Sequence, residues 1–246
     1  MRPKRLFFSL LLLILVNFGA MAQKQVTSQA LYWTRYYNQL HINKNLSWHN
    51  EFDNRRFFDK NKQHHLIIHT RLHYKFIKNA DAAVGMTYSL QSPQDPILSS
   101  GLIIPELRPN QEINLSNPYS KKFTLNQRLR IDERFIRKNN GTILLSGYDF
   151  NFRFRYRLQA TYKLSKDEDQ TPTVLKLADE IMINAGKRIV SNHFDQNRIY
   201  AALEQGIYKN ITAELGYLYW FQQRASGNQF FDRDIIRFTL NHKINL

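Results

Sequence analysis

Six arginines occupy alternate positions in two neighbouring stretches of the sequence. They are Arg128, Arg130, Arg134, Arg153, Arg155 and Arg157. A guanidinium group binds carboxylate or phosphate oxygens through paired hydrogen bonds, so these residues can hold anions or build an internal ion network. In a dry protein core such charges are too costly without matched carboxylates, whereas an enclosed polar lumen accommodates them.

Carboxylates with the same alternating spacing could neutralise these arginines. We therefore predict a lumen ion network made of the six arginines together with Arg108, Glu51, Asp53, Glu106, Glu112 and Asp132. Glu180, Glu204 and Glu214 are further candidate partners. Two interpretations stay open: a structural network that fills a narrow barrel, as small barrels usually do, or a channel lining that favours anions.

Histidine also recurs with regular spacing, at His65, His69 and His73, and His49 lies in the preceding segment. Four residues of extended chain span about 13 Å, so no two of the first three can share a metal ion with bonds of about 2 Å. We predict that they are ordinary lumen-facing side chains and that the protein has no metal and no cofactor. A cross-strand pair with His49 remains open.

Common enzyme signatures are missing from the sequence: it has no Gly-x-Ser-x-Gly, no phosphate-binding loop, no His-Glu-x-x-His and no cysteine. The nearest local grouping of catalytic residue types is Ser191, His193 and Asp195, in an expected loop. We predict that the protein is not an enzyme. A barrel-embedded lipid hydrolase or deacylase is the alternative, because catalytic sites are defined by geometry rather than by proximity in sequence.

The residues from 148 to 161 explain how one set of arginines is positioned. Phe150, Phe152 and Phe154 alternate there with Asn151, Arg153 and Arg155. Strict alternation predicts a β-strand with one apolar, aromatic face and one cationic face. Eleven such segments follow one another along the chain, mostly 11 to 14 residues long. Strands that cross a membrane need about 9–11 residues, whereas globular strands average about 5–6.

These long alternating segments predict an all-β fold, an antiparallel up-and-down transmembrane β-barrel. Single-chain bacterial barrels have even strand numbers, so we expect twelve strands, or ten as the next choice. Aromatic residues near strand ends, Trp33 and Trp220 among them, are interpreted as membrane-interface girdles. The alternative fold is a soluble periplasmic β-sandwich or a lipocalin-like binding protein.

The N-terminus has the features of a secretory signal peptide over residues 1–22. A basic start precedes the apolar run Leu6 to Ala20, and Ala20-Met21-Ala22 is a small-x-small cleavage site. Cleavage would leave residues 23–246 as one barrel domain, mature from Gln23, in the bacterial outer membrane. The run is shorter than the roughly 20 residues that a spanning helix needs.

The net charge is +15, and +12 without the three basic residues of the signal peptide. A basic balance favours anionic partners. An exported chain rarely meets nucleic acid and this one has no nucleic-acid motif, so we predict no nucleic-acid partner. We expect contact with outer-membrane lipid and lipopolysaccharide, and with small anionic solutes.

Several short motifs resemble a known family. They are Trp33, Glu51, Arg55, Pro105-Glu106-Leu107-Arg108, the run from Arg128 to Arg134, and the run from Arg153 to Arg157. On these residues the chain resembles the uncharacterised "domain of unknown function 2490" family of exported bacterial proteins. The resemblance covers nearly all of the mature chain and implies an outer-membrane barrel. It implies no activity, so the function stays open between envelope structure and the passage or binding of small polar or anionic ligands.

Overall fold

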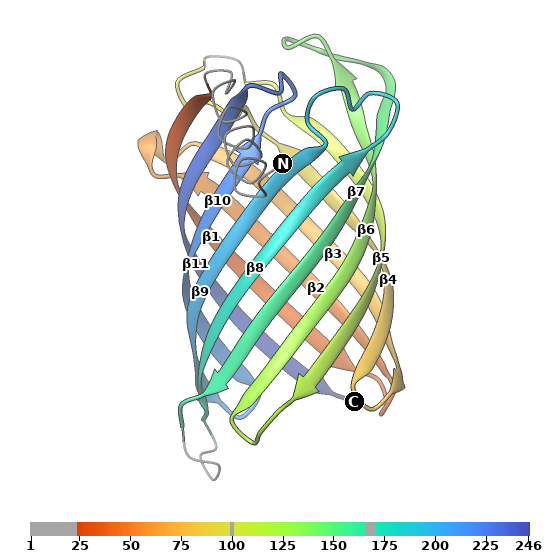
Figure 1. Cartoon of the computed structure of the whole chain (residues 1–246), viewed down its shortest axis with the longest axis vertical. Helices are drawn as coiled ribbons and strands as arrows, with labels where there is room; N and C mark the ends of the chain where they lie inside the picture. Colours follow the sequence, from red (N-terminus) through yellow and green to blue (C-terminus); the bar gives the residue numbers. More distant parts are fainter. Residues whose placement is uncertain (1–23, 99–100, 166–170) are drawn as a thin grey trace, which may run out of the picture.

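A single β-sheet closes on itself to form a barrel (Figure 1). The computed structural model describes residues 24–98, 101–165 and 171–246. The predicted signal peptide, residues 1–22, lies outside the described residues. Within the described part of the chain, no helix has the length and apolar character needed to cross a membrane.

Eleven strands build the barrel, and their bounds agree closely with the alternating segments of the sequence. In chain order they are β1 (Gln25–His41), β2 (Leu46–Phe57), β3 (Gln63–Ile77), β4 (Ala80–Gln91), β5 (Ile104–Pro118), β6 (Phe123–Asn139), β7 (Leu144–Lys163), β8 (Thr173–Ala185), β9 (Phe194–Tyr208), β10 (Ile211–Gln223) and β11 (Gln229–Asn245). A short 3₁₀ turn, η2 (Asp59–Asn61), follows β2.

The strand number corrects the expectation of twelve or ten strands. Consecutive strands pair antiparallel, and the barrel closes where β1 pairs with β11 in parallel, from Gln25 opposite Gln229 to His41 opposite Asn245. An odd number of strands forces this geometry, because the first and last strands of an up-and-down barrel then run in the same direction. The β-sandwich alternative is also wrong, since one closed sheet replaces two packed sheets.

Side chains are distributed inside out relative to a soluble barrel. On β7, Phe150, Phe152 and Phe154 are exposed on the outer surface, whereas Asn151 and Arg153 are buried in the interior. The same alternation places apolar residues outside along most other strands. The pleat of the strand causes this arrangement, because neighbouring residues point to opposite faces of the sheet.

Connections differ between the two ends of the barrel. The turns after β1, β3, β5 and β9 lie at one end and are short, and the chain ends beside them (Figure 1). The longest connection within the described ranges at the other end begins at Ser92, after β4. Below, the two ends are called the turn end and the loop end.

Candidate functional site

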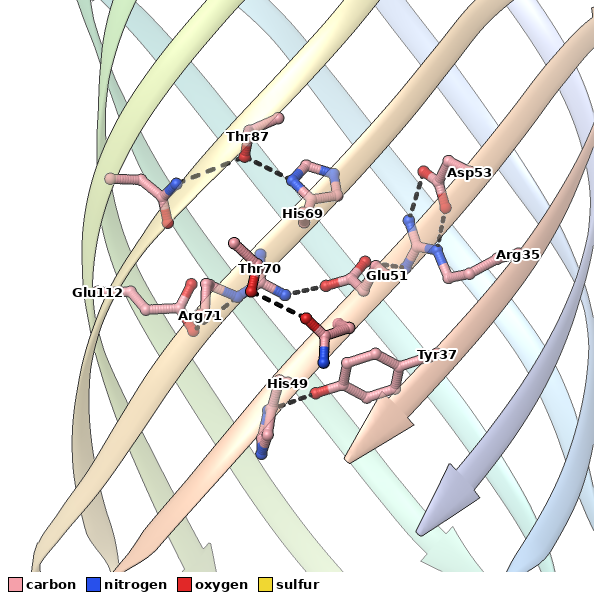
Figure 2. A network of polar contacts seen from close by, with 12 residues as sticks. Arg35, Tyr37, His49, Glu51, Asp53, His69, Thr70, Arg71, Thr87 and Glu112 are labelled. Atoms are coloured by element: carbon pink, nitrogen blue, oxygen red, sulfur yellow. Dashed lines mark hydrogen bonds and ion pairs between the residues drawn. The ribbon is translucent and has the colours of Figure 1, made fainter. Parts of the chain in front are cut away.

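A chain of alternating charges crosses one wall of the barrel interior. Arg35 on β1 pairs with Asp53 at 2.5 Å and with Glu51 at 3.3 Å, both on β2. Glu51 also accepts a hydrogen bond from Arg71 on β3. Arg71 in turn lies 3.9 Å from Glu112 on β5. Figure 2 shows these side chains reaching across the interior from neighbouring strands.

The same chain of charges continues through β6 and β7 to β8. Glu112 lies 3.8 Å from Arg130, which pairs with Asp132 at 2.6 Å. Asp132 lies 3.4 Å from Arg155, and Arg155 pairs with Glu180 at 2.8 Å. Acidic and basic groups therefore alternate around the wall. The attraction between opposite charges offsets the desolvation cost of burying them.

Glu180 also receives Arg128 at 2.6 Å, so one carboxylate serves two arginines of the predicted network. Towards the loop end, Glu106 holds Arg108 at 2.8 Å and Arg134 at 2.5 Å. Every partner in these contacts comes from a strand position that faces inward. The alternating pattern of the sequence is sufficient to bring them together once the barrel closes.

Two predicted arginines have other partners. Arg153 pairs with Asp195 of β9 at 2.7 Å. Arg157 donates a hydrogen bond to the side chain of Gln159, and no carboxylate pairs with it among the described residues. All twelve residues of the predicted network thus face the interior. Seven of them join the chain of charges, Glu106, Arg108 and Arg134 form a separate cluster towards the loop end, and Arg153 and Arg157 take other partners.

A glycine makes room for one of the crossing arginines. Gly85 on β4 lies opposite Arg71 on β3. A Cβ atom at Gly85 would stand 2.3 Å from Cγ of Arg71 and 2.3 Å from the backbone oxygen of Thr70. The glycine therefore leaves room for the side chain of Arg71 where it leaves β3 and leans over β4.

Two further cations of the interior, Lys176 and Arg237, were not included in the sequence-based network, whereas Glu204 and Glu214 were candidate partners in it. Lys176 bridges Glu204 and Glu214 at 2.7 Å each, and Arg237 pairs with Glu214 at 2.9 Å. Their strands are less regular in sequence, and Lys176 is a single charge among apolar neighbours. The signal that could have found them is the inward register, which requires the strand pairing to be known.

A cavity of about 330 Å³ occupies the middle of the barrel. Eleven arginines and four carboxylates line it. Some of these arginines pair with carboxylates just behind the cavity wall, as Arg55 pairs with Asp53 at 2.6 Å. Even so, the surface presented to the cavity is strongly cationic, which favours anions over cations.

Cavities continue from this one towards both ends of the barrel. A cavity of about 530 Å³ at the loop end shares Arg55, Arg108, Arg153 and Arg198 with the central one. Two cavities at the turn end, of about 330 and 260 Å³, share other lining residues with it, including Asp81. The interior is therefore a series of adjoining spaces along the barrel axis.

One sector of the interior is apolar rather than charged. Its buried residues come from β1, β2, β9, β10 and β11 and are Leu31, Trp33, Phe57, Tyr200, Ala202, Leu218, Trp220 and Ile235. Trp33 and Trp220 are 1% and 2% exposed. The interpretation of these two tryptophans as membrane-interface residues is therefore wrong, because β1 and β10 turn them inward. Trp48, by contrast, lies on the outer surface.

The histidines of β3 contact other interior groups. His69 hydrogen-bonds to Thr87 at 2.6 Å, and His73 pairs with Asp81 at 2.8 Å. His49 stacks on His73 with ring centroids 3.8 Å apart. Both ring nitrogens of His49 meet hydroxyl groups, from Tyr37 and from Ser47. In the described ranges, no group of three or more potential metal ligands is found.

The grouping of Ser191, His193 and Asp195 does not assemble into a hydrogen-bonded set within the described part of the chain. Asp195 is buried and pairs with Arg153 at 2.7 Å, whereas Ser191 and His193 are exposed. The carboxylate of Asp195 therefore pairs with Arg153 in the barrel interior and does not orient His193.

The fold and this interior define a class of protein, a closed β-barrel with an apolar outer face and an arginine-rich lumen. The chain belongs to the family described as "Protein of unknown function (DUF2490)", whose model matches residues 30–231. This agrees with the resemblance drawn from the sequence motifs. No curated protein and no solved structure matches the chain.

Proposed function

We propose that this protein is an outer-membrane β-barrel that passes small anions through its arginine-lined lumen, and that it is not an enzyme. The observation that carries the proposal is the series of adjoining cavities with eleven arginines around the central one. Rings of arginine favour anions in pores, and fixed guanidinium groups cost no reorganisation when an anion enters.

The outer surface supports the membrane location. Large apolar side chains such as Phe154, Leu129 and Val84 are exposed on the outer faces of their strands. Soluble monomers rarely expose a continuous apolar surface larger than a few hundred Å². A hydrocarbon environment removes that cost, and a closed barrel leaves no unpaired strand edge in the lipid.

In this proposal the turn end faces the periplasm and the loop end faces outward, as is usual for outer-membrane barrels. Basic residues at the loop end, such as Lys60, Lys138 and Arg188, would then meet lipopolysaccharide phosphates. The lipocalin-like alternative requires an apolar interior that accepts apolar ligands, whereas the central cavity is mainly cationic.

Conductance in planar bilayers under a potassium chloride gradient tests the proposal. The sign of the reversal potential should report a preference for chloride over potassium. Substitution of glutamine for Arg130 and Arg155 together should reduce that preference, because both line the central cavity. A preference for potassium, or absence of conductance from correctly folded protein, would contradict anion passage.

A further inference from the structure

Arg198 differs from Arg157 and Arg233, which also have no carboxylate partner among the described residues, because it lacks a side-chain hydrogen bond as well. Arg198 on β9 makes no ion pair and no side-chain hydrogen bond within the described ranges, and its buried Nε has no acceptor. It lines both the central cavity and the loop-end cavity. Its charge is therefore located at the junction of the two spaces.

Two tryptophans hold this arginine in place. The guanidinium carbon of Arg198 lies 4.6 Å from the ring centroid of Trp220 and 5.6 Å from that of Trp33. The two rings meet edge to face, with centroids 5.8 Å apart. Arg55 stacks on Trp33 at 3.9 Å, and Arg233 stacks on Trp220 at 4.4 Å. Cations and aromatic rings thus alternate through the cluster.

This cluster has more hydrogen-bond donors than acceptors. The indole nitrogens of Trp33 and Trp220 are buried and have no hydrogen-bond partner among the described residues. Arg233, which is fully buried, donates to the side chains of Gln29, Gln94 and Gln222, and no carboxylate pairs with it in the described part of the chain. Near Arg198 the carboxylate of Glu180 is already shared by Arg128 and Arg155. An anion placed beside Arg198 would supply the missing negative charge.

The cavity wall next to Arg198 is apolar on one side. Leu218 and Tyr200 line the central cavity together with Trp33, and all three belong to the apolar sector of the interior. A bare inorganic anion would leave this apolar wall in contact with water. An organic anion with a compact hydrocarbon body would satisfy both sides of the cavity at once.

We propose that Arg198 and the paired tryptophans form a binding subsite for small organic carboxylates that carry an apolar body. The carboxylate pairs with Arg198, and the hydrocarbon body packs against Leu218 and Tyr200, which are cross-strand neighbours. This inference rests on the proposed function, because it names the class of anion that the lumen selects.

Tryptophan fluorescence of the purified, detergent-solubilised full-length mature protein provides the test. The chain has three tryptophans, so the W48F background leaves emission from Trp33 and Trp220 only. Titration with cyclohexanecarboxylate, which does not absorb at the excitation wavelength, should give a saturable change. Acetate and inorganic phosphate should bind at least tenfold more weakly. Equal binding of phosphate would overturn the ligand class, and no saturable change with cyclohexanecarboxylate would overturn the subsite.

Variants identify the residue responsible. R198Q should weaken binding of cyclohexanecarboxylate at least tenfold. R137Q is the matched control, since Arg137 also stacks on an aromatic ring, that of Tyr148 at 5.4 Å, but on the outer face of β6. It should bind as tightly as the parent. R198K, which keeps the charge and loses the planar fork, should also bind more weakly and serves if R198Q does not fold.

Binding that survives both Arg198 substitutions would overturn the assignment. Failure of the proposed function is distinguished by the bilayer measurement: anion-selective conductance without carboxylate binding would overturn this subsite alone.

Discussion

Glu180 is one of the carboxylates that hold two cations of the lumen. Its carboxylate is buried and receives both Arg128 at 2.6 Å and Arg155 at 2.8 Å. Neutralising it leaves Arg128 without a carboxylate partner among the described residues and leaves Arg155 with Asp132 alone. Breaking a buried ion pair costs more than a surface pair contributes, because the remaining charge stays desolvated.

We expect E180Q to lower the free energy of unfolding by about 3–5 kcal/mol. Urea unfolding in detergent micelles, followed by tryptophan fluorescence, measures this change. D179N is the matched control, because the neighbouring Asp179 points outward and accepts a hydrogen bond from Asn197 at 2.6 Å. Its effect should stay within about 0.5 kcal/mol. Equal effects of the two substitutions would contradict the buried network.

Substitution of Gly85 gives a second prediction about a single residue. A methyl group at this position would collide with Cγ of Arg71 and with the backbone of Thr70, each at 2.3 Å. We expect G85A to cost about 1–3 kcal/mol, the usual range for overpacking. The same urea titration measures it.

G101A is the control for that substitution, since no described residue beyond its chain neighbours comes within 4 Å of a Cβ atom built at Gly101. Its stability should match that of the parent protein. A neutral G85A would mean that Arg71 does not cross the sheet at this glycine.

At the scale of the strands, alternation alone predicts most of the architecture. Strands β2 and β10 have the bounds of two expected segments, Leu46 to Phe57 and Ile211 to Gln223, although Asn50 in β2 and Trp220 in β10 depart from strict alternation. The inward positions of the predicted arginines follow from the same pattern. Strand pairing then determines which carboxylate each arginine meets, and that information is absent from local sequence.

The tryptophan sector shows where the pattern fails. Trp33 and Trp220 point inward, while Asp234 on β11 points outward. Hydrophobicity is thus locally inverted relative to the rest of the barrel. A period-2 pattern gives two faces but not which one faces inward, so aromatic residues near strand ends were assigned to the membrane interface instead of the lumen.

The parallel pairing of β1 and β11 can be tested by a disulfide cross-link between the two strands. Thr34 lies opposite Phe238, and both side chains are exposed on the outer face. Because the chain has no cysteine, the double variant T34C/F238C should form a disulfide on mild oxidation. Mass spectrometry of a digest identifies the cross-linked peptides.

T34C/L240C is the control for register. Moving one cysteine two residues along β11 adds about 6.6 Å along the strand, which takes the pair beyond the reach of a disulfide, about 7 Å between Cα atoms. Cross-linking of this variant alone, or of neither variant, would contradict the parallel seam.

For the whole molecule, closure of the barrel by a parallel pair of strands is the feature that local sequence could not supply. Eleven alternating segments are visible in the sequence, but expecting an even number rests on how most bacterial barrels close. The parallel seam removes that requirement. Parallel pairing is slightly less stable per residue than antiparallel pairing, and here it extends over the full length of both strands, from Gln25 to His41 and from Gln229 to Asn245.

The inside-out distribution of side chains places a physical requirement on each surface of the barrel. Buried arginines require carboxylates or anions inside, and exposed apolar side chains require lipid outside. A membrane satisfies the outer surface, and the ion network with a cationic cavity satisfies the inner one. The location and the lumen chemistry are therefore two parts of one proposal, and a single pair of adjacent residues can test both faces.

Leu158 and Gln159 are neighbours on β7 that face opposite ways: Leu158 is exposed on the outer surface, and Gln159 lines the turn-end cavity. The measurement is the fluorescence of a bimane label on L158C or on Q159C in protein reconstituted into vesicles of brominated lipid. Bromine atoms on acyl chains should strongly quench the label at position 158 and leave the label at position 159 unchanged. Quenching at 159 but not at 158, or at neither position, would contradict a barrel that has its apolar face in lipid and its arginines in an enclosed lumen.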